Sequence, residues 1–220
     1  MKNLFNLRHL LLIFGMTMGT TVVVGQEACT VERTDELIII RIPKDSRLEF
    51  TTHYPNTDEA LLCIPAAFTL PDGNIQGAYM VNGRMKNQYN RHSKVSIKGR
   101  SFTLAPQFTT DNGFQQMCLV RRHQAVHFRD NSHEIRRAIC KESEQADAII
   151  VESRKALTMN EFAQLLARTM VTAVYTDMGS YGYGWYHTKE GLNYLSSLYF
   201  YKRKKQTNWI VSRRSAPSSQ

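Results

Sequence analysis

The chain has 220 residues, and its 28 lysine and arginine residues exceed its 19 aspartate and glutamate residues, for a formal net charge of +9. The length fits one domain with a substantial apolar core, and the sequence has no internal repeats or low-complexity blocks that would indicate a repeat array. In a cytosolic protein this excess of positive charge would suggest nucleic acid as a partner, so the expected compartment decides how the charge is interpreted.

The N-terminal segment has the three parts of a secretory signal peptide. Lys2 and Arg8 form a positive n-region, residues 10–24 are mostly apolar, and Gly25 is small enough to precede a cleavage site at Gln26. An uncleaved membrane anchor is the alternative, although the apolar stretch is short for a membrane span. We therefore expect an exported protein, periplasmic or extracellular, with no membrane span after cleavage.

Export changes the expected partners. Without Lys2 and Arg8 the net charge is +7, and an exported protein meets anionic glycans, phosphorylated polymers or membrane surfaces rather than nucleic acid. Much of the charge lies near the C-terminus, in residues 202–205 and in Arg213 and Arg214. These runs favour a solvated surface, and contact with anionic polymers is the alternative.

Four cysteines follow the predicted cleavage site, and their spacings match no zinc-binding pattern. An oxidising compartment permits disulfides, for which four cysteines allow three pairings. Two of the cysteines lie in apolar runs, so buried free thiols are the alternative. The cysteines are Cys29, Cys63, Cys118 and Cys140.

Short β-prone runs dominate the mature chain. Asn82-Gly83 and the segment 98–100 each stand between two such runs, and each predicts a hairpin turn. We expect strands over residues 37–42, 47–53, 61–64, 76–81, 94–97, 101–104, 117–120, 136–139, 148–151, 171–175 and 208–212.

One helix is clearly indicated. Thr158 and Glu161 have the spacing of a capping box, and apolar residues at helical spacing follow up to Met170. Residues 191–199 suggest a second, shorter helix. Many strands, few helices and no alternation of strand and helix predict an α+β fold: a mixed, mainly antiparallel sheet with one or two packed helices in a single domain.

The stretch after residue 171 is the most informative for function. A buried strand, residues 171–175, delivers Asp177 to its end, and a loop rich in glycine and aromatic residues follows. The carboxylate can face a pocket there, glycines let a ligand approach the backbone, and aromatic faces suit sugar rings. An aromatic loop packed on the sheet rim is the alternative. The loop residues expected to bind substrate are Gly179, Ser180, Tyr181, Tyr183, Trp185 and Tyr186.

Arg136 and Arg137 are the second candidates for the site. On a strand they point to opposite faces, so only one of them reaches a given pocket. A guanidinium in the pocket can bind a phosphate or a carboxylate, whereas the alternative is a surface salt bridge.

His123 and His127 have the spacing of two metal ligands on one helix face. The segment between them lacks the glutamate of the HExxH motif, and a strand would place the two side chains about 13 Å apart. We predict neither a metal nor another cofactor.

The C-terminal half resembles the phosphodiester glycosidase domain, with three features in the family's order. They are the arginine-bearing strand 136–139, the helix that opens at Leu157, and the strand end 173–180, which stands where the family has Asp-Gly-Gly-Gly-Ser. The family includes the catalytic domain of the mammalian uncovering enzyme and exported domains of Bacteroides-type bacteria.

Upstream segments extend the resemblance. Residues 65–68 resemble the family's Asn-Gly-Gly-Phe turn, and residues 77–83 resemble the hairpin after it. The predicted organisation is therefore a signal peptide (1–25), N-terminal strands (26–59), a phosphodiester-glycosidase-like domain (60–212) and a basic, polar tail (213–220).

The resemblance implies hydrolysis of a sugar phosphodiester at the anomeric carbon, without a cofactor. It places Asp177 beside that carbon, as base, nucleophile or electrostatic stabiliser, and one of Arg136 and Arg137 on the phosphate. It also places Phe68 beside the substrate.

Departures from the family pattern leave a second interpretation open. Pro65 stands in place of an asparagine, and Ala66, Ala67 and Met178 stand in place of glycines. The chain is then either an enzyme of altered specificity or a carbohydrate-binding protein that no longer cleaves.

Overall fold

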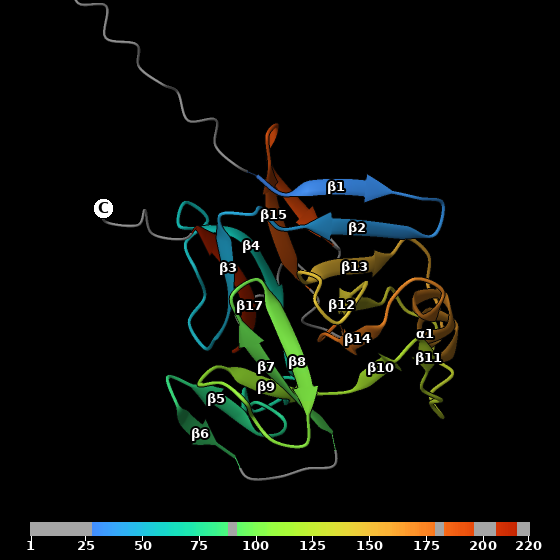
Figure 1. Cartoon of the computed structure of the whole chain (residues 1–220), viewed down its shortest axis with the longest axis horizontal. Helices are drawn as coiled ribbons and strands as arrows, with labels where there is room; N and C mark the ends of the chain where they lie inside the picture. The colour runs from blue at the N-terminus through green and yellow to red at the C-terminus, as the bar shows by residue number, and fades with distance from the viewer. Residues whose placement is uncertain (1–27, 88–91, 179–182, 196–205, 215–220) are drawn as a thin grey trace, which may run out of the picture.

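Antiparallel strand pairing organises the described part of the chain into three sheets (Figure 1). The computed structural model describes residues 28–87, 92–178, 183–195 and 206–214. Strands make up 49% of the structure and helix 5%. The predicted α+β class with one or two packed helices is therefore wrong, and the fold is β-rich. The reason is that the sheets cover much of one another's apolar surface, which the prediction had assigned to helices.

The largest sheet has seven strands in the order β1-β2-β13-β12-β14-β10-β11. Its three central strands are buried along their whole length, as expected where both faces of a sheet are covered. The strands are β1 (Thr30–Arg33), β2 (Leu37–Arg41), β10 (Cys118–Arg121), β11 (Gln124–Ala125), β12 (Arg137–Lys141), β13 (Ile149–Ser153) and β14 (Thr172–Tyr175).

The second sheet has the order β16-β15-β4-β17-β3, with β4 buried at every position. Its closing strand continues through Arg214, so Arg213 and Arg214 belong to the sheet and not to a tail. The strands are β3 (Ser46–Thr51), β4 (Ala60–Pro65), β15 (Gly184–Thr188), β16 (Gly191–Leu195) and β17 (Trp209–Arg214).

The third sheet has the order β6-β5-β9-β7-β8 and lies at the lower side of Figure 1. Its β5–β6 hairpin turns at Asn82 and Gly83, whose φ angles are 51° and 72°, as the Asn-Gly pair predicted. The strands are β5 (Tyr79–Val81), β6 (Arg84–Lys86), β7 (Ser93–Lys98), β8 (Ser101–Ala105) and β9 (Gly113–Gln116).

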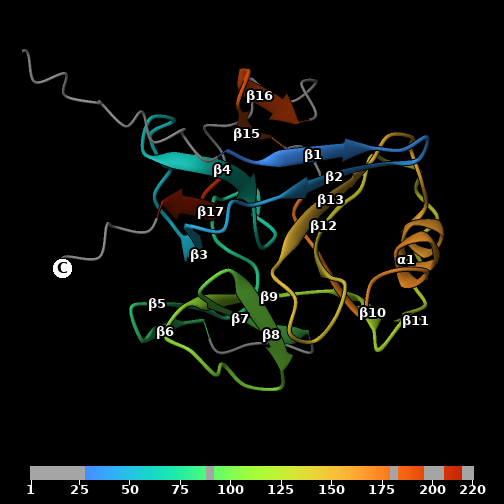
Figure 2. The same cartoon turned by 45° about the horizontal axis from the view of Figure 1, so that its top comes forward.

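Helix α1 (Met159–Ala167) covers one face of the seven-stranded sheet, beside β10 and β11 (Figure 2). The predicted capping box is present: the Thr158 hydroxyl accepts from the Glu161 N–H, and the Glu161 carboxylate accepts from the Thr158 N–H. Phe162 and Leu166 are fully buried against the sheet. The other face of the same sheet packs with the remaining two sheets in a shared core that includes Ile139.

The second predicted helix is wrong. Residues 191–195 form strand β16, which pairs with β15 from Thr188↔Gly191 to Gly184↔Leu195. Leu192 and Tyr194 point to solvent, and Leu195 is buried. The apolar spacing of this short segment fits a strand as well as a helix, and pairing with β15 decides between them. Residues 196–199 lie outside the described part of the chain.

A buried ion pair lies between the first two sheets. The Arg137 Nη2 and Nε atoms donate to the Glu152 Oε2 atom at 2.5 and 2.8 Å, and both side chains are almost completely buried. Gly184 packs directly against this pair, because a Cβ atom there would lie 3.1 Å from the Arg137 Nη1 atom and 3.2 Å from the Cys63 carbonyl oxygen. A larger residue at this position would require the arginine or the β4 backbone to move by a few tenths of an ångström.

All four cysteines are free thiols, so the interpretation as free thiols is correct and no disulfide forms. Burial raises the pKa of the Cys29 thiol to about 12 and raises that of Cys140 well above its usual value. The protonated thiol is a poor nucleophile, so these side chains behave as small apolar core residues.

Arg137→Met should lower the free energy of unfolding by about 3–5 kcal/mol, because it leaves the Glu152 carboxylate buried without its cation. Arg41→Met is the matched control: its ion pair with Glu142 is about 40% exposed on both sides, so its loss should cost under about 1 kcal/mol. Chemical denaturation of the two variants measures the difference, and equal losses would contradict a structural role for the buried pair.

The native protein should react slowly with a thiol reagent at about pH 8, because burial raises the pKa of Cys29, Cys118 and Cys140. After unfolding in denaturant without any reductant, the same reagent should count four thiols per chain. A count of two or zero would show that disulfides form.

Candidate functional site

A pocket of about 410 Å³ opens where β12 and β14 meet the segment that follows β4. Asp177 and Arg136 both line it, together with the Tyr175 phenol and the Phe68 ring. The two predicted polar residues with the clearest chemistry thus lie in one cavity. Its complete lining is Phe68, Thr69, Pro71, Met117, Asp130, Ser132, Glu134, Arg136, Met159, Tyr175 and Asp177.

Asp177 is positioned by backbone contacts just after β14. Its N–H donates to the Ala66 carbonyl at 3.0 Å, and its Oδ2 atom accepts from the Thr69 N–H at 3.0 Å. Asp177 is 3% exposed although it lines the pocket. These two contacts to the backbone help to fix the orientation of the carboxylate.

Arg136 enters the pocket from the residue before β12, with its backbone N–H bonded to the Ser153 hydroxyl. Its Nε atom donates to the Leu157 carbonyl at 3.1 Å, and its Nη2 atom donates to the Ser132 carbonyl at 2.7 Å. The guanidinium is therefore fixed by carbonyl groups on two sides.

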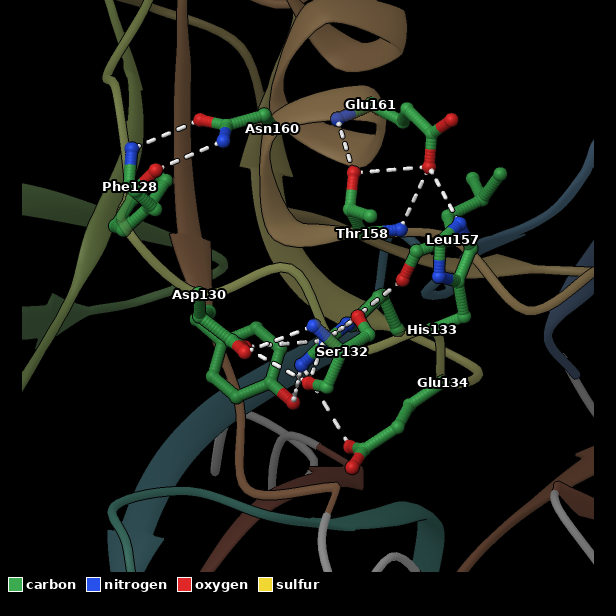
Figure 3. A network of polar contacts seen from close by, with 11 residues as sticks. Phe128, Asp130, Ser132, His133, Glu134, Leu157, Thr158, Asn160 and Glu161 are labelled. Carbon is green, nitrogen blue, oxygen red and sulfur yellow. Dashed lines mark hydrogen bonds and ion pairs between the residues drawn. The ribbon is translucent and has the colours of Figure 1, made fainter.

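Two carboxylates on the loop before β12 neutralise this guanidinium. Asp130 lies 3.3 Å from the Arg136 Nη2 atom, and Glu134 lies 3.6 Å from the Nη1 atom. In Figure 3, Asp130 lies to the left of Ser132 and Glu134 lies to its lower right. Both carboxylates are about half exposed, so either can turn into solvent, whereas the Arg136 guanidinium is buried and keeps its need for an anion.

Tyr175 and Phe68 form the aromatic side of the pocket. Their ring centroids lie 5.8 Å apart, and the Tyr175 hydroxyl accepts from the Arg136 Nη1 atom at 3.4 Å. Burial raises the pKa of Tyr175 to about 12, despite the opposing effect of Arg136. The phenol is therefore protonated at neutral pH and has one O–H to donate to a ligand.

Asn208 holds the segment that carries Phe68 and Thr69. Its side chain accepts from the Ala67 N–H at 2.7 Å and donates to the Ala67 carbonyl at 3.1 Å and to the Thr69 hydroxyl at 3.2 Å. Asn208 is fully buried at the start of β17. The alanines in this segment are also fully buried, which leaves little room for larger side chains.

The other predicted site residues do not line the pocket. Arg137 points to the opposite face of β12 and pairs with Glu152, as strand alternation predicted for one of the two arginines. Tyr183, Trp185 and Tyr186 are buried at the β15 end of the second sheet, where the Trp185 Nε1 atom donates to the Tyr54 hydroxyl at 2.8 Å.

Gly179, Ser180 and Tyr181 lie outside the described residues. The N-terminal segment of residues 1–25 and the basic run 202–205 also lie outside them.

Metal binding has no structural support in the described ranges, where no group of three potential ligands is found. His123 lies in the turn before β11, and His127 follows that strand. Within the same ranges, no helix has both the length and the apolar character needed to cross a bilayer.

Eight of the eleven lining residues escaped the sequence analysis, and five of them contact Arg136 or Asp177: Thr69, Asp130, Ser132, Glu134 and Tyr175. Tyr175 precedes Asp177 by two positions on one strand run, so alternation could have placed the two on the same side. Asp130 and Glu134 precede Arg136 in an acidic loop, but no spacing rule connects a loop carboxylate to a strand arginine. Asn208 escaped as well, because its contacts are to residues 141 and 139 positions away.

Comparisons with known proteins give little further information. Neither a protein-family model nor a curated protein matches the chain. Among solved structures, the chain is similar to one described as a hypothetical protein from Synechocystis, with 12% sequence identity and a TM-score of 0.48. The similarity covers 84% of this chain and 61% of that chain, so this chain spans about three fifths of the other's length.

Asn208→Ala should lower the free energy of unfolding by about 2–4 kcal/mol, because it leaves the buried Ala67 N–H and carbonyl without partners. Amide exchange at residues 66–69 should accelerate more than exchange elsewhere. Asn56→Ala is the matched control, since the exposed Asn56 side chain accepts only from the nearby Asp58 N–H. Equal exchange at residues 66–69 in both variants would contradict the proposed role of Asn208.

Proposed function

We propose that this protein is an exported hydrolase that cleaves a sugar phosphodiester at the anomeric carbon. The observation that carries the proposal is that the Asp177 carboxylate and the Arg136 guanidinium line one pocket, with aromatic rings beside them. A carboxylate suits the developing positive charge of a sugar ring, and a guanidinium suits a phosphate. The sequence resemblance to phosphodiester glycosidases supports the same reaction, and the predicted signal peptide supports the location.

In the proposed reaction, water attacks the anomeric carbon while the bond from that carbon to the phosphate oxygen breaks. The phosphate monoester leaves with the electron pair of the broken bond, and Asp177 accepts the proton released by the water. A phosphate monoester is a weakly basic leaving group, so the reaction needs little help from a general acid. This matches a pocket in which the phenol of Tyr175 stays protonated and no second buried carboxylate lies among the described lining residues.

Arg136 stabilises the phosphate in this proposal, but its charge is paired in the free protein. A substrate phosphate takes the place of Asp130 and Glu134, whose carboxylates can move into solvent. The carbonyl groups of Ser132 and Leu157 keep the guanidinium in place during this exchange. The exchange makes binding dependent on the negative charge of the substrate, because a neutral sugar cannot replace the two carboxylates.

A carbohydrate-binding role without cleavage is the second candidate. The observation that favours it is the same pairing of Arg136, because every nitrogen of this guanidinium already contacts an oxygen of the protein. The Phe68 and Tyr175 rings would then hold a sugar by their faces. Trp185, which the sequence favoured for this role, is fully buried in the second sheet.

Wild-type protein should hydrolyse an aryl or sugar α-phosphodiester, and Asp177→Asn should lower the rate by about 10²–10⁴-fold while folding is preserved. Asp72→Asn is the control, since its exposed carboxylate lies in the turn after the same segment and outside the pocket. Product release measured with a phosphodiester panel tests the proposal. Inactivity of the wild type across that panel would exclude it, and glycan binding lost in Phe68→Ala would then establish the binding role.

A further inference from the structure

A second cavity, of about 240 Å³, lies at the opposite end of β14 from the candidate site. It opens between the seven-stranded sheet and β8 of the third sheet. Arg121, Arg122 and Lys141 provide three positive charges in its lining, and Glu144 provides one negative charge. The remaining lining residues are Phe102, Thr103, Leu104 and Thr172.

Strand register places part of this charge on one face of the sheet. Lys141 of β12 pairs with Thr172 of β14, and Thr172 pairs with Arg121 of β10. Residues paired across neighbouring strands point to the same face, so the lysine and the arginine flank the threonine hydroxyl about 10 Å apart at their Cα atoms. Both side chains are long enough to reach one ligand above Thr172.

Lys141 is 4% exposed, which is unusual for a lysine. Its Nζ atom donates to the Phe102 carbonyl at 3.3 Å and to the Glu144 carbonyl, and it lies 5.8 Å from the centroid of the Phe102 ring. The nearest carboxylate is that of Glu144, at 3.8 Å, and this side chain is 62% exposed. Neutral carbonyl groups and one exposed carboxylate thus hold a buried ammonium.

The arginines have fewer partners still. Arg121 donates to the Ser93 hydroxyl at 3.0 Å. Within the described ranges, neither Arg121 nor Arg122 forms an ion pair with a carboxylate. The cavity therefore has an uncompensated positive charge, in contrast to the Arg136 pocket, where two carboxylates face the guanidinium.

The turn that carries Arg122 adopts a backbone conformation that its residues disfavour. Arg122 and His123 have φ angles of 51° and 61°, between Arg121 and Gln124, which pair across the hairpin. Two-residue turns of this kind favour Asn-Gly, as at Asn82-Gly83 in the β5–β6 hairpin. Strained backbone of this kind is characteristic of ligand-binding positions. Arg122 occupies this turn and lines the cavity.

We propose that this cavity binds a tetrahedral oxyanion, a phosphate or sulfate group, through Arg121, Arg122 and Lys141, with the Thr172 hydroxyl as a further donor. A guanidinium donates two parallel hydrogen bonds to such a group, and the cavity volume accommodates one group of this size. The site is separate from the Arg136 pocket and does not depend on hydrolysis there. In an anionic polymer it would hold a charged group while another part of the chain occupies the Arg136 pocket.

The test is a titration with inorganic phosphate at constant ionic strength. The amide chemical shifts of Lys141 and Thr172 are measured at each phosphate concentration. Phosphate should shift both amides with saturation in wild-type protein. Arg122→Asn should raise the apparent Kd for phosphate about tenfold, because it removes a charged hydrogen-bond donor. The same substitution should keep the protein folded, because asparagine tolerates the positive φ angle better than arginine does.

His123→Asn is the matched control, since it places asparagine in the same turn but removes no lining residue. It should leave the apparent Kd unchanged. Arg136→Gln should also leave these shifts unchanged, which separates this site from the proposed active site. Sulfate should compete with phosphate at the same amides.

Three results would overturn the proposal. The first is an equal response to sodium chloride at matched ionic strength, which would indicate screening alone. The second is an unchanged Kd in Arg122→Asn. The third is the disappearance of the shifts in Arg136→Gln, which would assign phosphate binding to the other pocket.

Discussion

The hydrogen bonds of the Ala66–Thr69 backbone connect the first two sheets, and the candidate site depends on them. This segment follows β4, and it bonds to Asn208 at the start of β17 and to Asp177 after β14. The bonds are buried, so each backbone group needs its partner in the folded state. Because Asp177 both donates to and accepts from this segment, the junction between two sheets helps to orient its carboxylate.

The residues of this segment fit the buried junction that they form. Pro65 needs no N–H, since it ends β4, and the side chain of Asn208 makes the polar contacts to Ala67. Ala66 and Ala67 fit because both are fully buried in a tightly packed junction. The segment thus holds Phe68 beside Asp177 in the lining of one cavity.

Local sequence patterns predicted the features that depend on neighbouring residues. The capping box of Thr158 and Glu161, the turn at Asn82-Gly83 and most β-prone runs form as expected, because each is decided within a few positions. Alternation also predicted that Arg136 and Arg137 face opposite sides, although it could not say which of the two reaches the pocket.

Long-range pairing decided what the sequence could not. Residues 191–195 became a strand because β15 lies beside them, and Trp185 is buried because β15 pairs on both sides, with β4 and with β16. The loop carboxylates that neutralise Arg136 and the amide that holds Ala67 come from segments whose proximity no local pattern specifies. The candidate site is therefore built by contacts between sheets, whereas the strands themselves follow from composition and alternation.

The free state of the four thiols has a consequence for where the protein can fold. No covalent link between distant segments restricts the unfolded chain, so the native state depends on packing and hydrogen bonding alone. Folding then requires no oxidant and no disulfide isomerase. The polypeptide can therefore reach its native structure under reducing conditions, in which all four thiols stay in the state that the structure shows.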